Sequence, residues 1–224
     1  MNYHISTSLI TQEFPKNCEC PLCSIKKIVE RNILEQFLND AVMEDDTRAR
    51  VNKLGFCKEH YDKLFQSQNK LSLALQAQTR MRTLQKLITV PTNPKSAKKQ
   101  AQALKETEKT CIVCDLIEFN MIRYYKTIAE MYFNEPDFRE TLKNTKGFCL
   151  PHYAELMEYS NYAHSKAKEY IKDLAELQQA NLERMQNELQ RFCDSHDYRN
   201  RQKPLGSASD ILPRMRTKFY GEKF

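Results

Sequence analysis

The sequence has few of the residues that build turns and none of the largest core residue. Its 224 residues include 4 Gly, 8 Pro and no Trp. A many-stranded sheet needs frequent turns, so this scarcity argues against an all-β fold and favours long helices. The mean hydropathy is −0.70, and the apolar residues available for a core are therefore modest in number. A small core of this kind commonly needs a cross-link such as a structural metal ion.

Long apolar runs and an export signal are also missing. No run approaches the roughly 20 residues of a membrane span. The first 17 residues lack the basic and apolar segments of a signal peptide. We therefore expect a cytoplasmic protein with no membrane partner, in which the eight cysteines are metal ligands rather than disulfides. The net charge of +6 is mildly basic and does not by itself indicate nucleic acid.

Motifs of the common enzyme classes do not occur. The chain has no Gly-rich phosphate loop, no Gly-x-Ser-x-Gly and no His-Glu-x-x-His. We therefore expect no catalytic residues and a protein that is not an enzyme.

A four-ligand pattern occurs twice in the chain. Each copy reads Cys-x2-Cys and then Gly-Phe-Cys-x2-His-Tyr, with 33 or 34 residues between the second and third cysteines. A single Cys-x2-Cys is common by chance, but a duplicate with the same order, gap and flanking residues is not. The predicted metal ligands are Cys20, Cys23, Cys57 and His60 in the first copy, and Cys111, Cys114, Cys149 and His152 in the second.

Three thiolates and one imidazole form a tetrahedral ligand set, for which zinc is the default ion. We expect two zinc ions per chain; an iron–sulfur cluster is the alternative that the same soft ligands allow. Four protein ligands leave no open position for water, so the sites are predicted to be structural. Each ion is expected to join the Cys-x2-Cys of a copy to the Cys-x2-His of the same copy.

Three further residues carry metal-binding chemistry outside this pattern. Cys18 lies two residues before Cys20 and could compete as a ligand. Cys193 and His196 form a third Cys-x2-His, without the preceding Gly and without a free Cys-x2-Cys partner. We interpret this spacing as coincidence; the alternatives are a partial third site that uses Cys18, or a thiol switch.

Apolar periodicity predicts an all-α fold with two pseudo-repeated three-helix modules and a long C-terminal helix. In each module a short helix is expected before the Gly-Phe-Cys, starting at Asp45-Asp46 in the first copy and at Glu135-Pro136-Asp137 in the second. The expected ranges are a lead-in over 1–17, the first module over 18–90, a linker over 91–110, the second module with the long helix over 111–196, and a basic tail over 197–224.

Two long helices are expected to follow the two histidines. After His60, one helix is predicted to carry Leu64, Leu71, Leu75, Met81, Leu84 and Ile88 on a shared face. After His152, apolar residues recur in steps of three and four from Leu156 to Phe192, with one shift of phase. This apolar seam predicts that the helix packs along the rest of the protein. The alternative is that it packs against a second copy of the chain.

Closed metal sites, no catalytic constellation and long exposed helices favour a binding or adaptor protein with a protein partner. Nucleic acid is a second candidate partner, through the basic tail and the linker lysines. A competing hypothesis is a redox sensor that releases metal when its thiolates are oxidised. The linker lysines are Lys95, Lys98, Lys99, Lys105 and Lys109.

The two copies resemble an uncharacterised family of bacterial proteins, mostly from Firmicutes such as Clostridia. The resemblance covers about residues 18–160 and is carried by Cys-Pro-Leu-Cys or Cys-Ile-Val-Cys, by Asp-x-Arg, and above all by the repeated Gly-Phe-Cys-x2-His-Tyr. It implies a cytoplasmic, helical, metal-binding protein and brings no activity with it. The second copy has Ile-Val in place of Pro-Leu, a difference that leaves the ligands unchanged.

Overall fold

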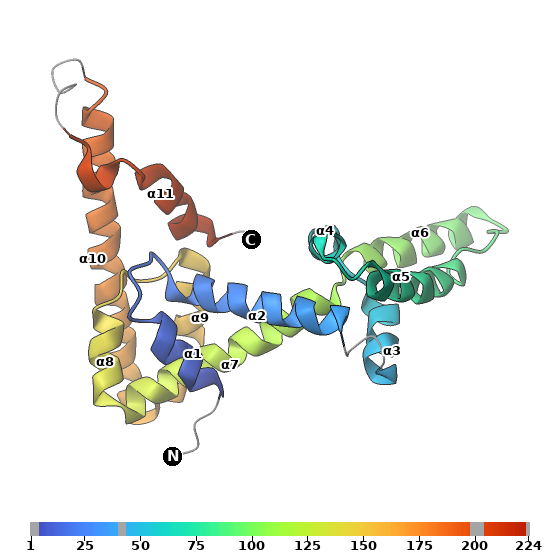
Figure 1. Cartoon of the computed structure of the whole chain (residues 1–224), viewed down its shortest axis with the longest axis horizontal. Helices are drawn as coiled ribbons and strands as arrows, with labels where there is room; N and C mark the ends of the chain where they lie inside the picture. The colour runs from blue at the N-terminus through green and yellow to red at the C-terminus, as the bar shows by residue number, and fades with distance from the viewer. Residues whose placement is uncertain (1–4, 40–43, 198–203, 223–224) are drawn as a thin grey trace. The chain divides into compact units, whose positions relative to one another are not determined.

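The computed structural model describes residues 5–39, 44–197 and 204–222 (Figure 1). Within these ranges every regular element is a helix. The all-α prediction is confirmed for this part of the chain. None of the described helices combines the length and the apolar character that crossing a membrane requires.

The chain forms two compact units that differ from the two expected modules. The first, which we call the split unit, consists of Met1–Lys27 and Met121–Phe224; the second, the continuous unit, is Ile28–Asn120. The boundaries lie inside α2 (Pro21–Leu38) and α7 (Ile112–Asn134). Because each of these long helices begins in one unit and ends in the other, each unit combines residues of both sequence copies.

The split unit has a core rich in aromatic residues. It contains α1 (Ile5–Glu13), α8 (Pro136–Lys143), α9 (Leu150–Glu158), α10 (Ala167–Asp194) and α11 (Ile211–Tyr220). The ring of Phe14, just after α1, lies 5.3 Å from that of Phe138 and 6.1 Å from that of Phe148. Phe14 is fully buried. Phe14, in the lead-in expected over 1–17, is thus part of the core.

The long C-terminal helix is interrupted where the sequence predicts continuity. A 3₁₀ segment, η2 (Ser160–Lys166), separates α9 from α10, and His164 in it has φ of 49°. This positive φ kinks the chain inside η2, shortly before α10 begins. α10 packs against α8, α9 and α11 of its own unit and buries Tyr170, Leu174 and Met185, as the intramolecular interpretation of the seam predicts.

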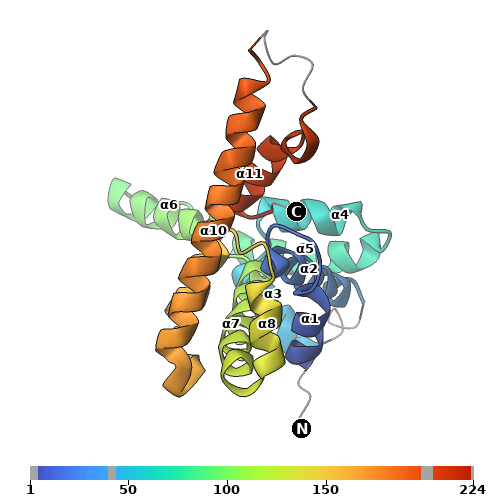
Figure 2. The ribbon, with the colours of Figure 1, turned by 90° about the vertical axis from the view of Figure 1, so that its left-hand side faces the viewer.

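The basic tail contains a helix that belongs to the core. α11 packs against α9 and α10, and Figure 2 shows it beside α10. Ile211 and Lys218 in α11 have no exposed surface. The expected basic tail over 197–224 therefore includes a helix, α11, with buried residues. Residues 198–203 and 223–224 of this range lie outside the described residues.

The continuous unit contains the short helix predicted for the first copy. α3 (Asp45–Leu54) carries Asp45 and Asp46 in its first turn, where the helix dipole favours negative charge, and ends at Gly55. Val51 on α3 is buried. In the second copy α8 begins at Pro136 with Asp137 in its first turn, so both predicted short helices are confirmed.

The long helix predicted after His60 is two helices. α4 (Lys58–Gln66) ends at Ser67, and α5 (Lys70–Gln85) begins anew because the Asn69 side chain accepts a hydrogen bond of 3.2 Å from the Ser72 amide. The break divides the expected apolar face. Leu64 is buried, whereas the exposed members are Leu71, Leu75, Met81 and Ile88.

The expected linker forms a solvated helix. α6 (Pro94–Glu108) starts with a capping box, in which Asn93 and Ser96 satisfy each other's amides, and with Pro at its first position. It buries none of its residues. Most of the linker expected over 91–110 is therefore a helix exposed to solvent.

Candidate metal centres

The structure brings the eight predicted ligands together in two groups of four, but it pairs the copies crosswise. In each group the ligand atoms all lie within 4.8 Å of one another. The prediction that each copy holds its own site is therefore wrong. The split unit joins Cys20 and Cys23 of the first copy to Cys149 and His152 of the second; the continuous unit joins Cys57 and His60 of the first copy to Cys111 and Cys114 of the second.

Helix lengths give a physical reason for the crossing. The 18 residues of α2 carry the chain about 27 Å away from the Cys20 turn, and the 10 residues of α3 span only about 15 Å. α3 is therefore too short to retrace α2 back to that turn. The loop that ends α3 instead contacts the segment around the second Cys-x2-Cys. The Ile112 amide donates to the Gly55 carbonyl at 3.1 Å, and the Thr110 hydroxyl donates to the Leu54 carbonyl at 2.6 Å.

The Cys-x2-His pairs have the same local structure in both units. Cys57 and Cys149 are the N-cap residues of α4 and α9, so each histidine lies in the first turn of its helix. The preceding glycines, Gly55 and Gly147, have φ of 68° and 71°. Glycine adopts this left-handed backbone without steric cost, which explains why the Gly-Phe-Cys is repeated. A helix N-terminus also stabilises thiolate charge.

The split-unit site is compact and fully enclosed. The Sγ atom of Cys149 lies 3.7 Å from that of Cys20 and 3.8 Å from that of Cys23. The His152 Nδ1 atom lies 3.4, 3.6 and 3.1 Å from the sulfurs of Cys20, Cys23 and Cys149. All four residues are buried.

The continuous-unit site has similar dimensions and more solvent access. The His60 Nδ1 atom lies 3.1 Å from the sulfur of Cys57, 3.3 Å from that of Cys111 and 3.4 Å from that of Cys114. The sulfurs of Cys57 and Cys114 are 4.0 Å apart. Cys114 is exposed and Cys57 is half-buried. Burial opposes ionisation of Cys111, but the hydrogen bond with His60 prevails and lowers the pKa of this thiol to about 6.

These separations match the edges of a coordination tetrahedron. Two sulfurs bound at 2.3 Å to one tetrahedral ion lie roughly 3.8 Å apart, and a sulfur and an imidazole nitrogen roughly 3.6 Å apart. Both groups are close to these values. Each can hold one metal ion with three thiolates and one Nδ1, and the donors then fill all four positions.

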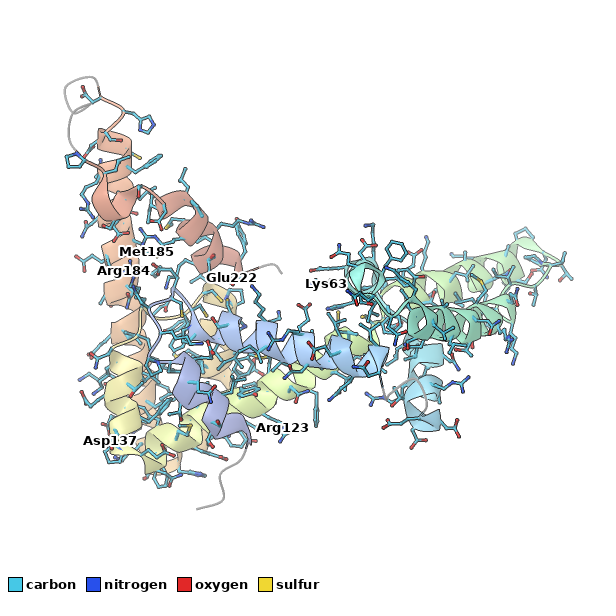
Figure 3. All side chains as sticks on the ribbon, viewed as in Figure 1. Lys63, Arg123, Asp137, Arg184, Met185 and Glu222 are labelled. Carbon is cyan, nitrogen blue, oxygen red and sulfur yellow. The ribbon has the colours of Figure 1, made fainter. Side chains whose placement is uncertain are left out.

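Glu30 on α2 orients the histidine of the continuous-unit site. Its Oε1 atom lies 2.9 Å from the His60 Nε2 atom and accepts a hydrogen bond of 2.7 Å from Lys63; Figure 3 labels Lys63 on α4. Burial alone would raise the pKa of Glu30, but the hydrogen bonds from His60 and Lys63 hold it below its usual value. A carboxylate that accepts from Nε2 fixes the tautomer that leaves Nδ1 free to bind a metal.

Replacing Glu30 with alanine is expected to weaken metal binding at the continuous-unit site by about 10- to 100-fold. The His60 ring then loses the acceptor that fixes its orientation. Competition with a chromophoric chelator measures the affinity of each site. The matched control is Glu35→Ala, since Glu35 lies on the same helix with 63% of its side chain exposed. Equal affinities for the two variants would contradict the orienting role.

Lys218 of α11 forms hydrogen bonds with both loops that carry the split-unit ligands. Its ammonium donates to the Glu19 carbonyl at 3.0 Å and to the Lys146 carbonyl at 2.8 Å. Glu19 directly precedes Cys20, and Lys146 precedes the Gly-Phe-Cys of Cys149. Burial lowers the pKa of Lys218. The side chain thus holds the first and second sequence copies together beside the metal site.

The end of α11 also contacts the ligands directly. The Glu222 amide donates to the Cys23 sulfur at 3.4 Å. A Cβ atom on Gly221 would lie 3.6 Å from the Cys149 sulfur and 3.7 Å from the Cys23 sulfur. Figure 3 labels Glu222, just past α11. The C-terminal segment therefore covers the sulfurs of this site and supplies a hydrogen bond that stabilises thiolate.

A buried ion-pair network supports the same segment. Glu19 binds Arg184 of α10 at 2.7 Å and Arg214 of α11 at 3.0 Å. Arg214 also pairs with Glu188. Burial alone would raise the pKa of Glu19, but the two arginines hold it below its usual range. Sequence patterns did not indicate Glu19, Glu30 or Lys218, because single charged residues carry no periodic signal.

The three residues singled out beside the main pattern do not join either group. Cys18 is half-buried, and Cys193 is exposed. The His196 Nδ1 atom lies 3.0 Å from the Phe192 carbonyl. Among the described residues, Cys18, Cys193 and His196 belong to no cluster that could hold a metal.

Comparison with known proteins identifies the family. The chain is 22% identical over 185 residues to a Caldicellulosiruptor protein described as "Uncharacterized 23.9 kDa protein in xynA 3'region", which covers 83% of this chain and 86% of that protein. No solved structure matches the chain. The match to "Family of unknown function (DUF6062)" extends over residues 1–224, and the chain therefore belongs to that family.

Proposed function

We propose that the chain is a zinc-binding, non-enzymatic helical protein that acts as a binding or adaptor module for another protein. Both ions are structural in this proposal, and each joins segments far apart in the sequence. The observation that carries it is the pair of Cys3His groups whose donor separations fit a closed tetrahedron. Zinc favours this ligand set, and four protein donors leave no position for a substrate.

Metal analysis of the purified chain tests the cofactor. Two zinc ions per chain and no visible absorption are expected, because zinc has no electronic transition in this range. A brown protein with absorption near 400 nm would replace zinc with an iron–sulfur cluster. A freshly purified protein that holds fewer than two ions, yet is as helical as the same protein loaded with two, would contradict a structural role for both sites.

The binding role is tested separately with photo-crosslinking residues at exposed positions of each unit. Leu212 on α11 is 54% exposed, and Phe65 on α4 is 59% exposed. Reproducible crosslinks to one macromolecule in cells support an adaptor. Crosslinks at neither position, with the metal content intact, would contradict it while leaving the zinc assignment unaffected.

A redox sensor is the second candidate, favoured by the exposure of Cys114. Its sulfur is 4.0 Å from that of Cys57, within reach of disulfide formation after a small movement. Two thiolates, hydrogen peroxide and two protons would give a disulfide and two waters, and the zinc ion would leave. Peroxide is expected to release zinc from the continuous-unit site first. Retention of both ions until the protein denatures would remove this candidate.

A further inference from the structure

The outer face of α5 carries a regular stripe of exposed residues. Leu71, Ala74, Gln78, Met81 and Gln85 follow one another in alternating steps of three and four, and all five are exposed. Leu71 is 69% and Met81 is 58% exposed. This is the spacing of the seam along which one helix packs against another.

The opposite face of α5 packs against the rest of the continuous unit and forms hydrogen bonds with it. Leu73 is buried, and the buried Gln76 side chain donates to the Phe37 carbonyl at 2.7 Å. Arg80 donates to the carbonyls of Asn52 and Lys53 at 2.5 and 3.0 Å. Because this face is held inward, the stripe is fixed in an exposed position and α5 cannot rotate to bury it.

The segment of the chain that carries the stripe is cationic. From residue 67 to residue 105, a segment we call the cationic hairpin, the chain has no Asp or Glu and eight Lys or Arg. These eight charges exceed the net charge of +6 of the whole chain. They are Lys70, Arg80, Arg82, Lys86, Lys95, Lys98, Lys99 and Lys105.

We propose that the outer face of α5 binds an acidic amphipathic helix of a partner protein. The stripe supplies the apolar contacts, and the cationic hairpin selects acidic flanks and speeds association. A second copy of this chain is disfavoured, because it would bring two cationic segments without acidic residues together. Gln78 and Gln85 within the stripe suit a helix interface better than lipid, and Leu71 and Met81 offer nothing to phosphate.

This inference rests on the proposed binding role, for which it names the partner chemistry. The probe is a fluorescent 21-residue helical peptide with Leu at the seam positions and Glu on the flanks, titrated with the full chain. We expect binding that weakens as salt rises. A matched peptide with Lys in place of Glu is expected to bind at least tenfold more weakly.

Charged substitutions within the stripe test whether the peptide binds there. Leu71→Glu with Met81→Glu is expected to weaken binding at least tenfold at unchanged helicity and metal content. The control is Phe119→Glu, since Phe119 lies on α7 in the same unit and is 62% exposed; this variant should bind like the original chain.

Several results would overturn the inference. These are no peptide binding at low salt, equal binding by the stripe variant, a dimer that the stripe variant abolishes, or stripe-dependent preference for phosphatidylserine vesicles or transfer RNA over the acidic peptide. The adaptor proposal is judged by other data, because crosslinks from Leu212 to a partner would preserve it even if the peptide did not bind.

Discussion

Replacing Cys149 with serine is expected to unfold most of the split unit and to leave the continuous unit folded. A structural zinc site contributes about 10–16 kcal/mol of apparent binding free energy, which is as large as the whole stability of a typical domain, about 5–15 kcal/mol. Cys149 is fully buried beside Cys20 and Cys23. The expected result is one zinc per chain and a large loss of helical circular dichroism.

Cys193→Ser is the matched control for this experiment. Cys193 is an exposed thiol on α10, in the same unit but outside both ligand groups. Its replacement should leave two zinc ions and the original helicity. If Cys149→Ser behaved like Cys193→Ser in both measurements, the split-unit site would not be structural.

Replacing Lys218 with alanine is expected to reduce the free energy of unfolding by about 3 kcal/mol and to accelerate zinc release from the split-unit site. The substitution leaves one buried and one half-buried carbonyl without their donor, at about 1–3 kcal/mol for a buried one, and opens space in a position with no exposed surface. Urea denaturation measures the stability, and a colorimetric chelator measures the rate of zinc release.

Two further variants separate the causes of this effect. Lys218→Met keeps most of the side-chain volume and removes the donors, so its loss of stability isolates the hydrogen bonds. Lys172→Ala removes a lysine whose side chain is 71% exposed and should change neither quantity. A Lys218→Ala variant as stable as Lys172→Ala would show that α11 does not hold the ligand loops.

The sequence was a good guide to local structure, because local structure depends on nearby residues. The paired aspartates start α3, Gly55 ends it, and the repeated Gly-Phe-Cys-x2-His places each histidine in the first turn of a helix. The same eight ligands that the repeat singles out lie in the two groups. The helix starts and ends and the short ligand motifs are encoded within ten or so residues of where they appear.

The pairing of the two copies could not be obtained in this way. Each copy supplies one Cys-x2-Cys and one Cys-x2-His. The Cys-x2-Cys of one copy can share an ion with the Cys-x2-His of either copy, and the spacing of Cys23 and Cys57 is compatible with both arrangements. The choice depends on how far α2 and α7 carry the chain, which is a property of the tertiary structure. Breaks such as Ser67–Asn69 and His164 were missed because one cap residue or one left-handed residue outweighs a continuing apolar pattern.

The role of α11 was missed for a related reason. Its buried contacts include Lys218 and Arg214, whose charges make the segment look like a solvated tail. The acceptors of Lys218, the carbonyls of Glu19 and Lys146, lie 199 and 72 residues away in the chain. Only the folded structure shows that these charges are matched.

The metal content of two double variants tests the crossed pairing most directly. If Cys20 and Cys149 bind the same ion, Cys20→Ser with Cys149→Ser loses one zinc and keeps one, whereas Cys20→Ser with Cys57→Ser loses both. Pairing within each copy reverses these numbers. One zinc in the first variant and none in the second is the result we predict; none in the first and one in the second would contradict the crossed arrangement.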